Sequence, residues 1–418
     1  MPLKQLLFTA LVGMACTCSA QVATSAVPGE SAHTGWAYSD SCRTFHRLWT
    51  TMDSVHSNRS GGLNVLYIGG SHVQGGWIGH EMRRLLAAWA PQAEMSRGMH
   101  LPYRLAHTNT PTHFRTEMEG SWTADRCTRG KGQARCEAAP IATGIVAYPE
   151  DSASIQHVSY LPDSSRTAYT SIQLWTNAER AQWHWTGNAP LRACTPLLGN
   201  LGWQLELERA ADTLAVYFVA PEKAGVWYAG INGHNASATP HITWHEWGHN
   251  GLRIRHAAAQ SGWDNLLQQL QPDLIFVGIG LNDAVDGKRL NVPAYAAHYE
   301  VLSSILRSSG AAVVLLGNTP AMHRSTSLAE PSASIGNWLR QHSQAHGMGY
   351  MDLSNVLGGP SIVAEWIEDE RMQPDGMHFT AKGYSAIANA LFTAWMDAYS
   401  QAQKAPSLNS ATDAQPQQ

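Results

Sequence analysis

Short apolar runs separated by glycine-rich turns alternate with amphipathic stretches at both ends of the chain. Buried parallel strands are predicted by the apolar runs at 63–68, 274–279, 312–316 and 350–353. Helices are predicted by apolar residues at helical spacing at 40–60, 76–90, 263–270, 293–307, 335–346 and 381–399. The order strand, turn, helix predicts an α/β domain around a parallel sheet.

The pattern changes between residues 111 and 240. Alternating or β-branched and aromatic segments lie there at 141–148, 169–175, 182–185, 203–207, 213–219 and 226–231. Turn residues separate them, which is typical of an all-β sandwich or jelly roll. We therefore predict an α/β domain over 21–110 and 241–400, interrupted by a β-rich module at 111–240 with carbohydrate binding as its candidate role. The polar tail at 401–418 is predicted to be disordered.

The first 20 residues have the pattern of a secretory signal peptide. Lys4 precedes an apolar run at 6–15, and small residues precede a cut after Ala20. The run is too short for a membrane-spanning helix. The sequence thus predicts an exported protein, periplasmic or secreted, without a membrane span. Acylation of Cys16 or Cys18, which would make the protein a lipoprotein, is the alternative.

The charge balance narrows the range of partners. The chain has 28 Lys and Arg against 32 Asp and Glu, a net charge of −4, and no basic run, so nothing points to nucleic acid. Apolar residues make up 44 % of the chain, which excludes a wholly disordered protein.

Four cysteines remain after the proposed cut, and an even number in an exported chain indicates two disulfides. Cys127 and Cys136 flank a glycine-containing segment that can form a hairpin tip, so we pair them, and by elimination Cys42 with Cys194. The alternative is that one or both pairs are free, buried thiols.

Side chains with catalytic chemistry follow two predicted strands and precede the last helix. Ser71 comes after the first strand, Asn282 after the strand at 274–279, and Asp375 and His378 before the closing helix. The carboxyl ends of parallel strands are where open α/β sheets bind ligands. A serine on a tight turn, a histidine oriented by an aspartate and an amide donor together are typical of a serine hydrolase that works through an acyl-enzyme. No metal or organic cofactor is expected.

The motifs around these residues resemble blocks I, III and V of the SGNH (GDSL-like) hydrolase superfamily. They read VLYIGGSHVQG at 65–75, PDLIFVGIGLNDA at 272–284 and PDGMHFTAKGY at 374–384. The resemblance implies a three-layer α/β fold in which Ser71 is the nucleophile, His378 the general base and Asp375 its orienting acid. Gly70 stands where the family usually has Asp, from which we expect an altered turn.

The resemblance also implies an oxyanion hole made by the Ser71 N–H, the Asn282 side chain and a glycine N–H. Gly98 and Gly251 are the two candidates for that glycine. An inserted β-module is a feature of O-acetylpeptidoglycan esterases and related bacterial carbohydrate esterases, and this arrangement favours Gly251.

The substrate that this implies is an O-acetylated polysaccharide. Peptidoglycan comes first, an acetylated plant or host glycan next and a lipid ester third. Five residues are candidates for substrate contacts: His72, Gln74, Gly98, Trp183 and Trp185. For His72 and Gln74 the alternative is turn packing, and for the two tryptophans it is a place in the module's core.

Two competing functions remain. HEWGH at 245–249 matches the zinc metalloprotease signature, which requires a helix. Here Pro240, Gly248 and Gly251 indicate a strand that enters a glycine-rich turn, so we interpret the match as chance. The other alternative is a non-catalytic carbohydrate-binding protein on a hydrolase scaffold, which the complete set of catalytic side chains argues against.

Overall fold

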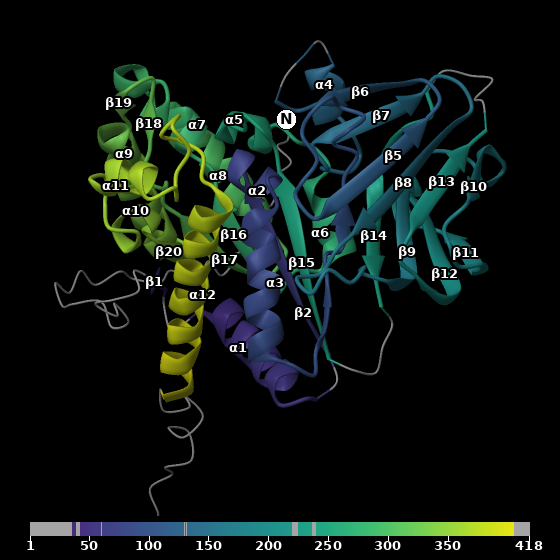
Figure 1. Cartoon of the computed structure of the whole chain (residues 1–418), viewed down its shortest axis with the longest axis horizontal. Helices are drawn as coiled ribbons and strands as arrows, with labels where there is room; N and C mark the ends of the chain where they lie inside the picture. Colours follow the sequence, from purple (N-terminus) through teal and green to yellow (C-terminus); the bar gives the residue numbers. More distant parts are fainter. Residues whose placement is uncertain are drawn as a thin grey trace, which may run out of the picture.

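The computed structural model describes residues 36–38, 42–59, 61–128, 130, 132–219, 225–235 and 240–404 (Figure 1). The predicted signal peptide at 1–20, with Cys16 and Cys18, lies outside the described residues, and so do residues 405–418 of the predicted disordered tail.

A seven-stranded sheet is the centre of the α/β part of the chain. Its strand order is β1-β20-β17-β16-β2-β15-β3, and all neighbours are parallel except β1, which is antiparallel to β20. The strands are β1 (Trp36–Ala37), β2 (Gly62–Gly69), β3 (Glu94–Ser96), β15 (His241–Gly248), β16 (Leu274–Gly278), β17 (Ala312–Leu316) and β20 (Gly349–Met351). The α/β prediction is confirmed, because the four apolar runs form β2, β16, β17 and β20.

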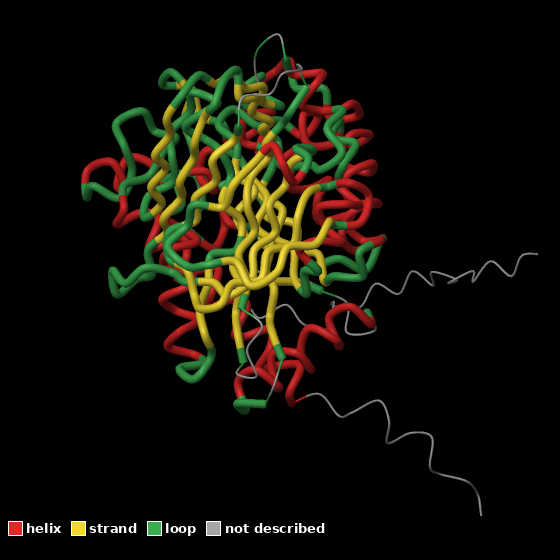
Figure 2. Tube along the Cα trace, turned by 90° about the vertical axis from the view of Figure 1, so that its right-hand side faces the viewer, coloured by secondary structure: helices red, strands yellow, loops and turns green. Residues whose placement is uncertain are grey.

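Helices cover both faces of this sheet because its strands are apolar on both sides. In β2, Val65 and Tyr67 face one layer, and Leu66 and Ile68 face the other. One layer consists of α1 (Arg43–His56), α3 (Trp77–Trp89), α11 (Ile362–Glu368) and α12 (Ala381–Lys404). The other consists of α5 (Ile254–Ala258), α6 (Trp263–Leu270), α8 (Val292–Ser308) and α9 (Ala329–Ala345). Figure 2 shows the strands in the middle of the molecule with helices to either side.

Two antiparallel sheets form the β-module, on the right in Figure 1. The smaller has the order β10-β13-β8-β5, and the larger has the order β11-β12-β9-β14-β7-β6 with β4 paired to β14. Their strands are β4 (Met99–His100), β5 (Phe114–Glu119), β6 (Trp122–Arg126), β7 (Ile145–Pro149), β8 (Ala153–Ser159), β9 (Tyr169–Thr176), β10 (Trp183–Trp185), β11 (Leu191–Pro196), β12 (Gly202–Ala211), β13 (Leu214–Phe218) and β14 (Tyr228–His234). Apolar side chains of both sheets share one buried cluster, among them Trp183, Phe218, Leu174 and Tyr228.

The β-module is part of the connection between two neighbouring parallel strands. β3 ends at Ser96, and residues 97–240 lead from there to β15, which pairs with β3 from His241 to Thr243. A parallel pair needs a crossover connection, which is usually a helix. Here most of that connection is folded as the module.

Two segment boundaries differ from the sequence predictions. The helix predicted at 335–346 begins earlier, at Ala329, because Pro331 lies in its first turn, where a missing N–H is tolerated. The closing helix continues to Lys404, so residues 401–404 are helical rather than disordered. Gln403 contributes by donating from Nε2 to Asp53 on α1 at 2.9 and 3.0 Å.

Among the described residues, no helix has both the length and the hydrophobicity needed to cross a bilayer.

The two predicted disulfides are wrong for this structure, in which all four described cysteines are free thiols. Cys42 precedes α1 in the α/β part, whereas Cys194 lies on β11 at the edge of the module, so these two belong to different cores. Cys127 and Cys136 are buried in one apolar cluster as thiols. Burial raises the pKa of both thiols, and that of Cys136 reaches about 12.

Candidate active site

The turn after β2 presents Ser71 at the carboxyl edge of the sheet. β2 ends at Gly69, Gly70 turns the chain, and Ser71 is the first residue of the short helix α2 (Ser71–Gln74). Its N–H has no partner one turn earlier in the helix, so it remains able to donate to another group. The Asn282 amide lies close to this turn, since a Cβ on Gly70 would lie 3.1 Å from Nδ2 of Asn282.

Ser71, His378 and Asp375 form a linked series of hydrogen bonds. Ser71 Oγ lies 3.0 Å from Nε2 of His378, and Nδ1 of the same ring lies 2.7 Å from Oδ2 of Asp375. The other carboxylate oxygen, Oδ1, accepts from the backbone N–H groups of Met377 and His378, both at 2.9 Å. This geometry can deprotonate a serine hydroxyl and hold the resulting imidazolium.

The electrostatics of Asp375 suit this role. Burial by itself would raise the pKa of its carboxyl. Hydrogen bonds from the His378 ring and from two backbone N–H groups outweigh that effect and lower the pKa below its ordinary value. The carboxylate therefore stays ionised in neutral solution and can stabilise a protonated His378 ring.

Two further donors reach the same point from neighbouring strands. Asn282 lies on α7 (Leu281–Ala284), which follows β16, and its amide lies beside Gly70. Gly251 follows β15, whose last residue pairs with Gly69, and His249 N donates to Gly69 O at 3.1 Å. Ser71, Gly251, Asn282 and His378 all line one open pocket of about 450 Å³.

The segment that carries Gly251 is fixed by bonds to its neighbours. Ile254 N donates to Oδ2 of Asp283 at 3.2 Å. Arg253 forms a bidentate ion pair with Asp286, with its two terminal nitrogens 2.5 and 2.9 Å from the carboxylate oxygens. Burial raises the pKa of Asp283 to about 6, against smaller lowering effects from the Ile254 N–H and Arg253.

Gln74 and His72 were candidates for substrate contact, but neither residue lines this pocket. Gln74 is 1 % exposed and its amide is bonded inside the protein, so it does not contact substrate. His72 is partly buried, with Nδ1 3.1 Å from the Tyr384 hydroxyl. Burial, and then the nearby His378, lower the pKa of His72 to about 3, so the ring stays neutral.

The other three candidates for substrate contact do not line this pocket either. Gly98 has a φ of +77°, and a Cβ on it would come within 2.3 Å of the His245 ring, so it serves close packing. Trp183 is fully buried in the module's core, and Trp185 is half-buried with Nε1 bonded to Ala189 O at 2.8 Å. Both tryptophans lie on β10, at the side of the module far from α2 (Figure 1).

Several pocket residues gave no usable signal in the sequence. Beside the residues above, the pocket is lined by Gly75, Trp77, Asn109, Thr110, Thr112, Asn250, Met377 and Tyr384. Residues 109–112 lie in an irregular loop without periodicity. Gly75, Met377 and Tyr384 carried a partial signal, since they lie within the motif segments at 65–75 and 374–384.

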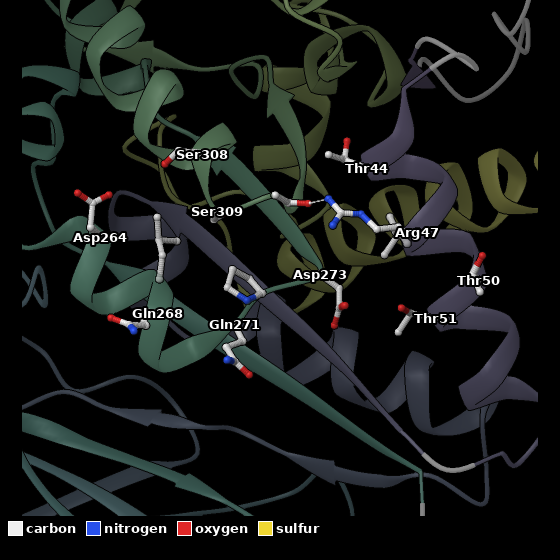
Figure 3. A pocket seen from close by; sticks show the side chains of 14 residues that line it. Thr44, Arg47, Thr50, Thr51, Asp264, Gln268, Gln271, Asp273, Ser308 and Ser309 are labelled. Carbon is white, nitrogen blue, oxygen red and sulfur yellow. Dashed lines mark hydrogen bonds between the residues drawn. The ribbon is translucent and has the colours of Figure 1, made fainter. Parts of the chain in front are cut away.

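A larger pocket, of about 670 Å³, lies at the opposite edge of the sheet (Figure 3). It is bordered by α1, by the ends of α6 and α8 and by the start of β16. Arg47 there donates to Gly310 O, and Asp273 accepts from Asn64 N at 2.8 Å. Ser308 and Ser309 bond to carbonyls of their own helix. None of the residues lining it is part of the Ser71 cluster.

The HEWGH segment is not built to bind zinc. His245 and Glu246 lie on strand β15, and His249 follows it. Along a strand, residues four apart are separated by about 13 Å, too far for both rings to ligate one ion. Glu246 instead pairs with Arg97 at 2.8 Å and with Arg83 at 3.6 Å, all three nearly inaccessible. In the described part of the chain, no three His, Cys, Asp or Glu side chains lie close enough to hold a metal.

Comparisons with known proteins give a family match and a likeness of fold. Residues 209–386 match the model of the GDSL-like lipase/acylhydrolase family, a range that contains Gly251, Asn282, Asp375 and His378. A solved peptidoglycan O-acetylesterase has a similar fold, with a TM-score of 0.69 and 18 % identity over 88 % of this chain and 99 % of that one. At this identity the likeness establishes the fold.

Other solved structures match a smaller part. A lipase/acylhydrolase from Enterococcus faecalis has a TM-score of 0.30 and 17 % identity over 39 % of this chain and 77 % of that one. An acetylxylan esterase from Geobacillus stearothermophilus has a TM-score of 0.30 and 16 % identity over 38 % of this chain and 73 % of that one. No curated protein matches the sequence.

Proposed function

Because this chain is a carboxylic ester hydrolase of the GDSL-like (SGNH) type, we propose that it removes O-acetyl groups from a polysaccharide. The hydrogen-bonded series Ser71–His378–Asp375, beside a pocket of polar side chains, is the observation that carries this proposal.

The reaction proceeds in two halves. Ser71 Oγ attacks the ester carbonyl while His378 Nε2 takes its proton and Asp375 stabilises the imidazolium. The negative oxygen of the tetrahedral intermediate is held by the Ser71 and Gly251 N–H groups and the Asn282 amide. Collapse of the intermediate expels the sugar alkoxide, which takes the proton from His378. Water then attacks the acyl-enzyme by the same route and releases acetate and free Ser71.

The pocket chemistry favours a sugar over a lipid as the alcohol. Asn109, Thr110, Thr112 and Asn250 supply neutral amide and hydroxyl groups around Ser71. Such groups exchange hydrogen bonds with hydroxyl-rich ligands. Trp77 adds one broad apolar surface, which suits the face of a sugar ring. The Asn109 and Asn250 amides bond to each other, and a lipid chain would offer no hydrogen bond to their remaining polar atoms or to the Thr110 and Thr112 hydroxyls, which costs free energy.

Peptidoglycan is the polysaccharide that we propose first. The likeness to the solved peptidoglycan O-acetylesterase spans 88 % of this chain, too large a share to omit the β-module. This supports the choice of substrate without fixing it at 18 % identity. Peptidoglycan lies outside the cytoplasmic membrane, so the proposal includes export by the signal peptide predicted at 1–20.

Acetate release from O-acetylated peptidoglycan and from acetylated xylan, measured side by side, tests the substrate. We expect faster release from peptidoglycan by the native enzyme and none by Ser71→Ala, which shows that release depends on the active site. Faster release from xylan would transfer the proposal to plant glycans. If neither polymer is deacetylated while an aryl acetate is hydrolysed, the polysaccharide proposal is wrong.

A further inference from the structure

We propose that Gln74 is a positioning residue that holds the Gly251 N–H in the oxyanion hole. The proposal rests on the ester-hydrolase chemistry of Ser71 and is independent of which alcohol the substrate contains. It concerns a side chain that lies three residues beyond Ser71 on α2 but contacts neither the pocket nor the reacting atoms.

The Gln74 amide joins three segments inside the protein. Its Oε1 accepts from Asn250 N at 2.6 Å. Its Nε2 donates to Asn109 O at 2.7 Å and to Thr108 Oγ1 at 2.9 Å. The residue is 1 % exposed, so water does not compete for these bonds. A buried amide with acceptor and donor both satisfied fixes the groups it bonds.

The bond to Asn250 acts on a turn whose central peptide carries the Gly251 N–H. Leu252 N donates to His249 O at 3.0 Å, which closes a β-turn over residues 249–252. Gly251 occupies the third position with a φ of +74°, whereas Asn250 is not among the residues with positive φ. This combination is that of a type II turn.

Types I and II differ mainly in the orientation of the central peptide. Their dihedral angles show that conversion from type II to type I rotates this peptide by roughly 150–170°. For the Gly251 N–H that we propose as an oxyanion donor, that rotation would turn the N–H away from the hole. The oxyanion hole therefore depends on which way one peptide faces.

The turn is held from both sides of that peptide. On the far side, Asp283 accepts from Ile254 N and Asp286 pairs with Arg253. On the near side, Gln74 accepts from Asn250 N, one residue before Gly251. Without the Gln74 bond the Asn250 N–H loses its partner. This side is then tied only by the Asn250 side chain, which bonds to Asn109, and by the His249 N–H, which bonds to Gly69 O, so the central peptide gains freedom to rotate.

A mutant cycle on aryl acetate hydrolysis tests this role. Gln74→Met keeps the length of the side chain but removes both bonds, and we expect kcat to fall about 10–100-fold with KM within about threefold, since one oxyanion donor contributes about 10²–10³ in kcat. In a Gly251→Ala background the side chain disfavours the φ of +74° and so already displaces the N–H, and the same change should lower kcat less than about threefold. In an Asn282→Ala background it should lower kcat by its full factor, because independent donors act additively.

Two further variants serve as controls. Thr108→Val removes a hydroxyl from the same network but leaves the bond between Gln74 and Asn250, so kcat should stay within about threefold of native. Gln74→Glu keeps an oxygen for the Asn250 N–H and should retain more kcat than Gln74→Met. If Gln74→Met does not fold, Gln74→Leu, which also lacks both bonds, replaces it in the cycle.

The outcomes are distinct. An equal loss of kcat in the Gly251→Ala and Asn282→Ala backgrounds would show that Gln74 does not act through Gly251. Native kcat in Gln74→Met, or failure of both Gln74→Met and Gln74→Leu to fold, would also overturn the proposal. None of these results depends on the polysaccharide, because the aryl acetate reports the esterase reaction alone.

Discussion

In the proposed mechanism, single side chains determine whether the ester bond is broken. We expect Ser71→Ala to lower kcat on an aryl acetate by a factor on the order of 10⁶, as removal of a triad serine does elsewhere. Asn282→Ala removes one amide donor and should cost about 10²–10³. Steady-state kinetics with the melting temperature as a folding control measure both. Near-native turnover by Ser71→Ala would remove it as nucleophile.

Asp283 gives a second prediction at this scale, for stability against pH. Burial raises the pKa of its carboxyl from 3.8 to about 6, so the folded chain binds this proton more tightly than the unfolded chain. The tighter binding of this proton therefore stabilises the folded chain fully below about pH 4, and this stabilisation is lost as pH rises to 6. Asp283→Asn is neutral throughout and keeps an acceptor for the Ile254 N–H. Its free energy of unfolding relative to native should rise across that window, by at most about 3 kcal/mol.

Urea unfolding at pH 4.5 and pH 7.5 measures this difference. A gain at pH 7.5 that exceeds the gain at pH 4.5 agrees with the raised pKa. An equal effect at both values would mean that the carboxyl titrates normally, and the account of its burial would fail.

Some residues of the site were predictable and others were not, for physical reasons. Ser71, Asn282, Asp375 and His378 lie in motifs at strand ends, and the structure brings them together. The choice between Gly98 and Gly251 needed the fold, because both are simply glycines in a loop. The sequence also could not separate Gln74 as a substrate contact from Gln74 as an internal bond, since only burial distinguishes them.

At the scale of an element, strand β15 stabilises the fold through one buried carboxylate. It carries the HEWGH letters, yet Glu246 is a buried partner of Arg83 and Arg97 rather than a base for zinc-bound water. Glu246→Gln leaves two buried guanidinium groups without their carboxylate, which should cost about 3–5 kcal/mol of stability. Esterase activity of the folded fraction should be unchanged, and thermal unfolding with activity at low temperature measures both.

The matched control is an exposed ion pair on β5. Arg115 and Glu117 lie 2.6 Å apart with both side chains largely in solvent, so Glu117→Gln should change stability by less than about 1 kcal/mol. Loss of esterase activity in well-folded Glu246→Gln, together with loss of the native enzyme's activity on chelation and its return with zinc, would contradict our interpretation and favour the metal site.

Elements were predictable where the pattern was long enough. β2, β16 and β17 are continuous apolar runs because both of their faces are covered by helices. β1 and β3 have two and three residues, too few to show a period. The short helices α2 and α7 start at Ser71 and Leu281, in the turns that follow β2 and β16. Four residues are too few to show a helical period in the sequence.

At the scale of the whole molecule, Trp183 belongs to the module's core and not to a binding surface. Trp183 is fully buried, packs near Trp203 and lies under the Arg180 guanidinium. Trp183→Ala should therefore lower the free energy of unfolding by about 3–5 kcal/mol. The KM for an acetylated polysaccharide and turnover of an aryl acetate should stay unchanged in the folded fraction.

Trp185→Ala provides the comparison, because this ring is half-buried and one bond ties it to Ala189. It should destabilise less than Trp183→Ala. A raised KM for the polymer with an unchanged melting temperature, in either variant, would instead indicate that the ring contacts sugar.

The position of the module between β3 and β15 also governs when the enzyme becomes active. β2 cannot gain its β15 neighbour until residues 97–240 have been synthesised, and Asp375 and His378 arrive later still. Contacts over such sequence separations are slow to form, because the entropy of closing a long loop is lost before the contact is gained. If the module folds first, the connection formed by residues 97–240 becomes effectively shorter, and less entropy is lost when β15 pairs with β2. A chain that stops before residue 375 carries its serine without a base. We therefore expect hydrolysis to begin only once nearly the whole polypeptide has folded, and chains that end before residue 375 to be inactive.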